Sequence, residues 1–163
     1  MKYKRFEDLP VWNAAIELAV AIYALTAKAE FAPHHGLRDQ LERASVSVSN
    51  NIAEGFERGT NKELLMFLYI SRGSAGEVRS MLSLLEHLPW SGELIGDIRA
   101  IKLKAESCSR QLKAWIQSLQ NSDLKGERFV DDKARRADKR SREREEFLAE
   151  LAAIRNTGSA SNN

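Results

Sequence analysis

The sequence lacks what several classes of protein depend on. Its 163 residues include one cysteine, Cys108, which excludes an internal disulfide and a thiolate metal cluster and makes a reducing compartment the expected setting. The first ten residues, MKYKRFEDLP, have no apolar stretch of the kind that a signal peptide carries. No apolar run approaches the roughly 18 residues of a membrane-spanning helix. We therefore expect a soluble, cytoplasmic protein with no membrane partner.

Catalytic motifs are also absent. The sequence has no glycine-rich phosphate loop after a strand, no HExxH pair and no nucleophile elbow. The adjacent His34 and His35 lack the i, i+4 spacing with which one helix face chelates a metal, so a solvated loop is the simpler interpretation. His87 is expected at the end of a helix, where it would stabilise the helix dipole. We predict no enzyme activity, no cofactor and no metal site.

Apolar residues recur at helical spacing in four segments that short turns separate. Asp8 is a candidate N-cap ahead of Pro10, and Thr60 precedes Glu63 by three residues, as in a capping box. In the last segment the apolar positions alternate steps of four and three, which is the packing period of helix bundles. The expected helices cover residues 10–30, 37–57, 60–88 and 93–119. Short connections make neighbouring helices antiparallel, so residues 1–120 are predicted to form an all-α, antiparallel up-down four-helix bundle.

The first helix has a wider apolar surface than a single contact needs. One part of this surface could face the bundle core and another part a second subunit. A central position within the bundle would account for it equally well.

Residues 40–77 carry an unusual mixture of small, polar and charged side chains. On the helix predicted over 37–57, polar residues at intervals of three or four form one stripe beside an apolar stripe. Gly73 and Gly76 fall inside the next helix, where each costs about 1 kcal/mol relative to alanine, so we expect the preceding helix to approach closely there. We predict a partly buried polar seam between the two helices, with a structural rather than a catalytic role. Its members are Arg43, Ser47, Asn51, Glu54, Arg58, Arg72 and Glu77.

The same stretch resembles a known family. The resemblance lies in residues 47–55, SVSNNIAEG, followed by Arg58, Phe67-Leu68, Arg72-Gly73-Ser74 and Glu77, and in an opening of Phe6-Glu7-Asp8-Leu9 and Val11-Trp12. With these motifs the chain resembles, from Tyr3 to Leu119, the bacterial four-helix-bundle intervening-sequence proteins. That family is in turn similar to the accessory variability determinants of diversity-generating retroelements. Ser49 departs from the pattern, because the family often has proline there.

The resemblance carries expectations about partners. Members of the family are encoded within inserted segments of large-subunit ribosomal RNA genes or beside retroelement reverse transcriptases. The similar accessory proteins form five-membered, barrel-like rings that bind nucleic acid and the reverse transcriptase. The resemblance therefore implies a homo-oligomer, expected to be a pentamer, with RNA or DNA and a reverse transcriptase as further partners.

Residues 121–163 differ in composition from the predicted bundle. The net charge of the whole chain is only +2, but residues 133–144 hold seven basic and two acidic residues, an excess of five. We predict a charged C-terminal extension that is either helical or disordered. Its cations could neutralise nucleic-acid phosphates, or they could belong to a solvated, salt-bridged helix. The candidate phosphate contacts are Lys2, Lys4, Arg5, Lys133, Arg135, Arg136, Lys139, Arg140, Arg142 and Arg144.

Two hypotheses of function follow. The first is a non-enzymatic, ring-forming protein that binds nucleic acid and assists the reverse transcriptase of a diversity-generating retroelement through its RNA. The alternative is a homo-oligomeric helical scaffold of the ribosomal RNA intervening-sequence type, which binds protein and not nucleic acid. Phosphate binding weakens steeply as salt rises, whereas an apolar protein interface does not, so salt dependence separates the two hypotheses.

Overall fold

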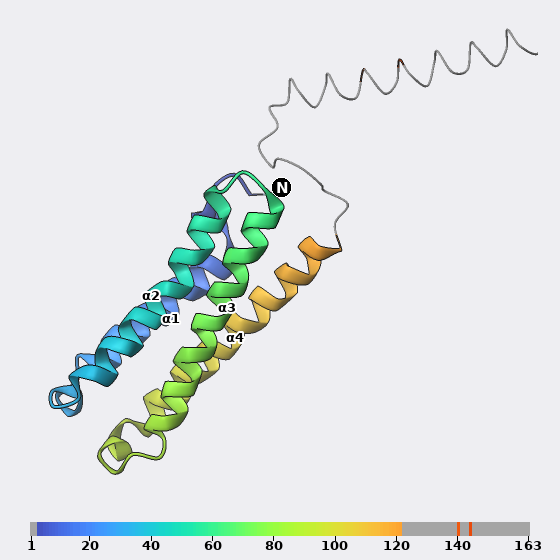
Figure 1. Cartoon of the computed structure of the whole chain (residues 1–163). Coiled ribbons are helices and arrows are strands. Elements are labelled where there is room, and N and C mark those ends of the chain that lie inside the picture. Colours follow the sequence, from blue (N-terminus) through green and yellow to red (C-terminus); the bar gives the residue numbers. More distant parts are fainter. Residues whose placement is uncertain (1–2, 122–139, 141–143, 145–163) are drawn as a thin grey trace, which may run out of the picture. The chain divides into compact units, whose positions relative to one another are not determined.

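The computed structural model describes residues 3–121 together with residues 140 and 144, and its core is a bundle of four helices (Figure 1). Consecutive helices run in opposite directions, and the described residues include no strand. This confirms the predicted all-α bundle. The helices are α1 (Pro10–Thr26), α2 (His35–Glu57), α3 (Asn61–Leu85) and α4 (Ile95–Gln120), and three short 3₁₀ turns, η1 (Phe6–Asp8), η2 (Ala29–Phe31) and η3 (Pro89–Leu94), lie between or before them.

Local sequence sets where several helices begin. Pro10 occupies the first position of α1, where its missing N–H costs no hydrogen bond. The Thr60 hydroxyl accepts a hydrogen bond from the Glu63 backbone N–H at 3.2 Å and donates to the Glu63 carboxylate at 2.8 Å. The predicted capping box is therefore confirmed. Asp8 is not the N-cap of α1, because it lies in η1 and Leu9 takes the cap position.

The connection between α1 and α2 differs from the prediction. Helix α1 ends at Thr26 rather than near residue 30, and α2 begins at His35, two residues earlier than expected. The buried Thr26 hydroxyl donates to a Glu42 carboxylate oxygen at 2.7 Å. Leaving the helix there lets the chain fold Phe31 into the core, where it is fully buried. Burying a large aromatic side chain offsets the loss of one helical turn.

Each helix packs against two neighbouring helices, so the four helices of one chain surround a common core. Helix α2 packs against α1 and α3, and α4 packs against α3 and α1. The core divides along the bundle into two clusters, one around Leu18, Leu41 and Leu82 and the other around Ile52 and Leu68. None of the helices in the described residues is long and apolar enough to cross a membrane.

Cys108 lies in the second core cluster and is fully buried. Burial raises the pKa of its thiol to about 11, because a thiolate would lose its hydration there. Cys108 therefore packs as a small apolar side chain.

Ion pairs join α3 and α4 at the surface. The Glu86 carboxylate accepts a hydrogen bond from Lys102 Nζ at 2.6 Å and pairs with Arg99 at 3.4 Å. The hydrogen bond from Lys102 lowers the pKa of Glu86 below its ordinary value. Water and salt screen surface pairs of this kind, so they contribute little and the apolar core carries most of the stability.

Helices α2 and α3 approach each other closely at Gly55. A Cβ built on Gly55 would lie 2.6 Å from Phe67 Cβ and 3.4 Å from the Leu64 carbonyl oxygen, both of which are fixed by the backbone of α3. We expect Gly55→Ala to destabilise the fold by about 1–3 kcal/mol, because α3 must shift to admit the methyl group. Thermal unfolding measures this change.

Gly36→Ala is the matched control, because Gly36 is in the same helix and a Cβ there would meet nothing within 4 Å. This control should be neutral or slightly stabilising. Equal melting temperatures for the two variants would contradict a close helix approach at Gly55.

Candidate functional site

Hydroxyl and amide groups, rather than charges, make the polar contact between α2 and α3. The buried Ser71 hydroxyl donates to the Val48 carbonyl at 2.8 Å, and the hydroxyls of Ser47 and Ser74 lie 2.9 Å apart. The Asn51 amide donates to the backbone carbonyl of Ser47 at 2.7 Å and to its hydroxyl at 3.0 Å. Short side chains satisfied in this way let two helix backbones pack closely without leaving polar groups unpaired.

The two interior glycines of α3 do not face α2, contrary to the prediction. The small residues that pack toward the interior are Ser71 and Ala75, which are fully buried. Gly73 and Gly76 are exposed, and a Cβ at either would meet nothing within 4 Å. Each residue of a helix turns by about 100°, so a patch of small residues six positions long spans more than one face.

The charges of the predicted seam lie at its outer edge. Glu54 and Arg58 form an ion pair at 2.6 Å within α2, and their side chains are 51% and 48% exposed. The hydrogen bond to Glu54 raises the pKa of Arg58. Among the described residues, neither Arg72 nor Glu77 makes an ion pair. The expected buried network of charges across the two helices is therefore corrected to one exposed pair, which solvent screens.

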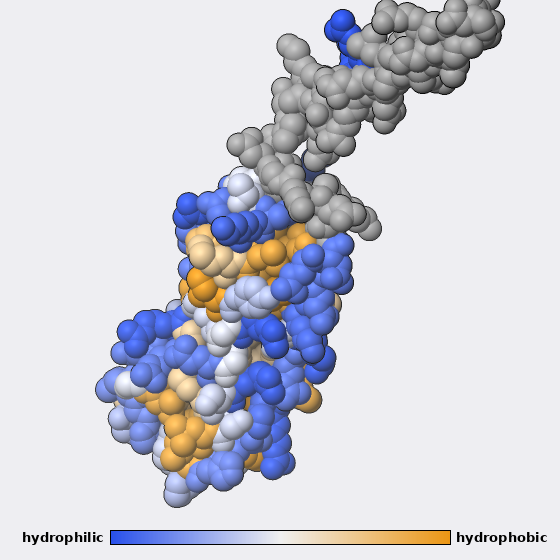
Figure 2. Space-filling model, turned by 45° about the vertical axis from the view of Figure 1, so that its right-hand side comes forward, coloured by the Kyte–Doolittle hydropathy of each residue, from blue (hydrophilic) through white to orange (hydrophobic). Residues whose placement is uncertain are grey.

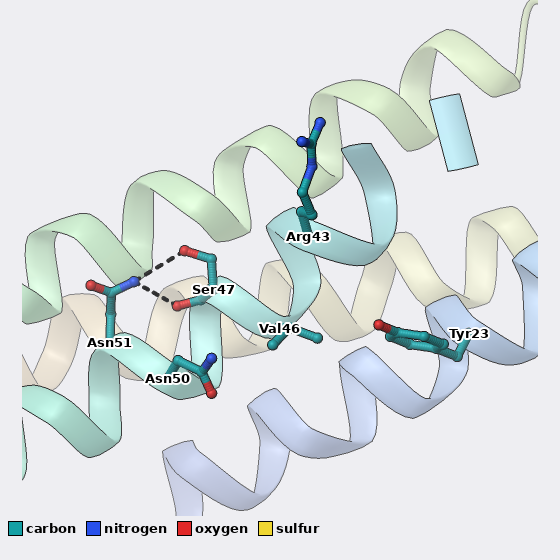
Figure 3. Close-up of a pocket in the computed structure, with 6 residues that line it drawn as sticks. All are labelled: Tyr23, Arg43, Val46, Ser47, Asn50 and Asn51. Atoms are coloured by element: carbon teal, nitrogen blue, oxygen red, sulfur yellow. Dashed lines mark hydrogen bonds between the residues drawn. The ribbon is translucent and has the colours of Figure 1, made fainter. Parts of the chain in front are cut away.

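A polar hollow lies beside this seam, on the outer side of α2 (Figure 3). Its volume is about 380 Å³, and its lining combines one cation, one aromatic ring, two amides, a hydroxyl and an apolar side chain. Tyr23 reaches it from α1, with its hydroxyl directed toward Val46. The lining residues are Tyr23, Arg43, Val46, Ser47, Asn50 and Asn51.

Apolar and small residues also gather on the face of α3 that points away from the bundle. Four large apolar side chains there are about half exposed, and the two glycines lie between them. We call this surface the α3 outer face. Figure 2 shows one side of the molecule, on which apolar areas are exposed among polar ones. Its members are Met66 (53% exposed), Tyr69 (47%), Ile70 (46%), Gly73, Gly76 and Leu84 (52%).

The candidate phosphate contacts fall largely outside the described residues. Lys4 is exposed, whereas Arg5 is paired with Glu7 at 2.6 Å, which raises the pKa of the Arg5 guanidinium. Arg140 and Arg144 are helical and exposed. The remaining predicted contacts lie outside the described residues, and they are Lys2, Lys133, Arg135, Arg136, Lys139 and Arg142.

Of the two adjacent histidines, His34 has a packing role. The His34 ring stacks on Trp90 with the ring centroids 4.0 Å apart, and His35 is the first residue of α2. The prediction of a solvated loop is wrong for His34, which is half-buried. Within the described ranges, no group of three or more His, Cys, Asp or Glu side chains is arranged to hold a metal ion.

These observations place the protein in the class of antiparallel four-helix bundles. Its helices α2 and α3 are joined by a contact made of small and polar residues. A model of the 23S rRNA-intervening sequence protein family matches residues 7–114, and the chain belongs to this family. The motifs that carried the resemblance from the sequence lie within or just before this range.

The solved structures that match the chain include one with the same fold. It is a protein of unknown function from the S23 ribosomal protein family of Bacteroides thetaiotaomicron, with a TM-score of 0.58 and 20% sequence identity over 66% of this chain and 98% of its own. No curated protein matches the chain.

Sequence reasoning does not find the hollow or the α3 outer face. Tyr23 falls in an apolar stripe of the first helix, and nothing in that pattern marks it as half exposed. The exposed residues Met66, Ile70, Gly73 and Leu84 fall at heptad-spaced positions on the side away from the core, and the polar Glu77 and Ser80 occupy the two positions between Gly73 and Leu84. That second heptad is the signal that could have found the α3 outer face.

The bond from Ser71 to Val48 is open to direct measurement. We expect Ser71→Ala to lower the free energy of unfolding by about 1 kcal/mol relative to Ser80→Ala, because it removes a buried interhelical hydrogen bond. Ser80 is exposed on the same helix, so it controls for the change in helix propensity. Denaturant unfolding of the two variants gives the difference. A value near zero would mean that the Ser71 hydroxyl does not hold the two helices together.

Proposed function

We propose that this protein is a non-enzymatic subunit that assembles with copies of itself through the α3 outer face. The observation that carries the proposal is the exposure of four large apolar side chains around two helical glycines. Each glycine costs about 1 kcal/mol within a helix, and no packing among the described residues compensates for it at these two positions. A second helix packed against them would gain close backbone contact.

The spacing of the outer face fits a helical partner. From Met66 to Leu84 the positions that step by four and three carry Met66, Ile70, Gly73, Glu77, Ser80 and Leu84. This period of 3.5 residues matches a helix that packs at a shallow angle along another helix. We infer that the contact is a helix-to-helix one along α3.

A second copy of the chain supplies apolar surface for such a contact. Val20 on α1 and Leu103 on α4 are 64% and 65% exposed, on helices other than α3. A contact between different surfaces of identical chains is head to tail, and such contacts close into rings when the rotation permits. The proposed assembly is therefore a ring, and a pentamer is the form that the resemblance to accessory variability determinants implies.

The polar residues of the seam support a structural role over a catalytic one. The hydroxyls of Ser47 and Ser71 are engaged in contacts between helices, so they are not held as nucleophiles beside a base.

Ile70→Lys tests the assembly. We expect this variant to sediment with the mass of a single 18.4 kDa chain, whereas the wild type has a multiple of that mass, because a buried lysine opposes an apolar contact. Gln117→Lys adds the same charge at an exposed position of α4 and should leave the mass of the assembly unchanged. Raised salt should not dissociate the wild type. An unchanged mass for Ile70→Lys, or a monomeric wild type, would contradict assembly through α3.

Nucleic-acid binding is the second candidate function, and it is favoured by the charge excess of five over residues 133–144. Such binding would assist a reverse transcriptase. This part of the proposal is supported by the resemblance of residues 47–55 and their neighbours to the intervening-sequence proteins, which are similar to the accessory variability determinants. Binding through phosphates would be governed by charge and shape, with little preference for base sequence.

Charge reversal tests this candidate. We expect replacement of Arg135, Arg136, Lys139 and Arg140 by glutamate to weaken binding of single-stranded RNA and to reduce the salt slope by about 0.7 for each phosphate that is no longer neutralised. Fluorescence anisotropy at several salt concentrations measures both effects. The double variant Arg110→Glu, Lys113→Glu, on the exposed side of α4, is the control and should bind like the wild type. Unchanged binding after the fourfold reversal would assign the cluster to a solvated segment.

A further inference from the structure

We propose that the hollow beside α2 binds one unpaired nucleotide of a single-stranded nucleic acid, with its phosphate on Arg43 and its base on Tyr23. This site is distinct from the basic cluster of residues 133–144 and lies on the bundle itself. The proposal rests on the side chains that line the hollow and on which of them are already engaged elsewhere (Figure 3).

Arg43 is a cation without a counter-ion in the described part of the chain. Its acidic neighbour in sequence, Glu42, is held by Arg38 at 3.0 Å and by the Thr26 hydroxyl at 2.7 Å. Of the described residues, no acidic side chain lines the hollow. A guanidinium in these conditions attracts an oxyanion, and its planar fork suits the oxygens of a phosphate.

The remaining walls match the rest of a nucleotide. The Tyr23 side chain is 47% exposed, which leaves ring surface open for stacking. Val46 adds an apolar contact, and the exposed Asn50 makes no hydrogen bond to another described residue, so its amide can donate and accept at a base edge. Unpaired bases are bound in proteins by aromatic stacking together with polar contacts to their edges.

Two of the lining residues are held in place by hydrogen bonds. Asn51 is held by two hydrogen bonds to Ser47, and Ser47 is in turn bonded to Ser74 on α3. The hollow of about 380 Å³ falls within the roughly 300–1,000 Å³ of small-ligand sites. An isolated carboxylate would use only Arg43 and would leave the ring and Asn50 without a role, so the full lining favours a nucleotide.

A single-stranded probe with and without bases tests the proposal. The probes are fluorescein-labelled decamers of riboadenylate and of deoxyadenylate, an abasic ribose-phosphate decamer, and free adenosine monophosphate as a competitor. We expect the wild type to bind the adenylate decamers at least about 5-fold more tightly than the abasic decamer, since stacking of one base contributes that much. A difference between the ribo- and deoxy-decamers distinguishes RNA from DNA as the source of the nucleotide.

Three variants assign the contacts. Tyr23→Ala should lower binding of adenylate to the abasic level, and Tyr23→Phe should retain it, because the ring and not the hydroxyl stacks. Arg43→Gln should weaken all decamers and reduce the salt slope by about 0.7. Arg110→Gln, which removes a 72% exposed arginine on α4, should leave binding unchanged. Tyr23 and Arg43 are exposed, so the folds should survive, and melting temperatures check this.

Two results would overturn the proposal. Equal binding of adenylate and abasic decamers, unaffected by Tyr23→Ala, would mean that only charge binds the strand. A changed assembly mass for Tyr23→Ala or Arg43→Gln would make the hollow part of a contact between copies. Neither result bears on Ile70→Lys or on the basic cluster, so failure of this site is distinguishable from failure of the functions proposed above.

Discussion

The close approach of α2 to α3 is the constraint on which the rest of the structure depends. At Gly55 there is no room for even a methyl group, and near Ser71 the two backbones are joined through a side-chain hydroxyl. Small residues such as Gly55 and Ser71 permit this approach, and at Gly55 the side chains of Phe67 and Leu64 fill the remaining space. The three-residue connection from 58 to 60 then makes α2 and α3 one stiff hairpin. Helices α1 and α4 complete the bundle by packing larger side chains against this hairpin. The buried side chains of the four helices form the two core clusters.

The same constraint decides which surfaces remain for partners. Helix α3 turns Ser71, Ala75 and Val78 inward, so residues about half a turn away must face outward. In most surface helices that outward face is charged, whereas here exposed apolar side chains and two glycines lie beside the exposed Glu77 and Ser80. On α2, Arg43 and Asn50 border the hollow, which Tyr23 of α1 also lines. The surface proposed for assembly and the hollow proposed for ligand binding therefore lie on the two helices whose packing sets which residues face outward.

Local sequence predicted the helices because helix formation is a local matter. The capping box at Thr60 and the heptad from Leu94 to Leu119 needed no knowledge of the fold. The orientation of Gly73 could not be obtained in this way, since a run of small residues covers more than one helix face and only the tertiary register selects the one that meets α2. The expectation that Glu54 is part of a partly buried seam is wrong for a related reason. Its partner is Arg58, four residues later in the same helix, and both side chains are about half exposed. The hollow was beyond reach, because it joins Tyr23 to α2 residues about twenty or more positions away.

The two proposed surfaces reinforce each other when taken together. A single nucleotide held by one ring, one guanidinium and an amide is bound weakly, because an open hollow desolvates little of its ligand. In a closed ring the same hollow recurs once per subunit at a fixed spacing. A strand that occupies one hollow is then held near the next at high effective concentration, and affinity rises without any new contact. A weak site on the monomer is therefore the expected property of a protein that binds nucleic acid as an assembly, and the apolar face of α3 is what would make that binding strong.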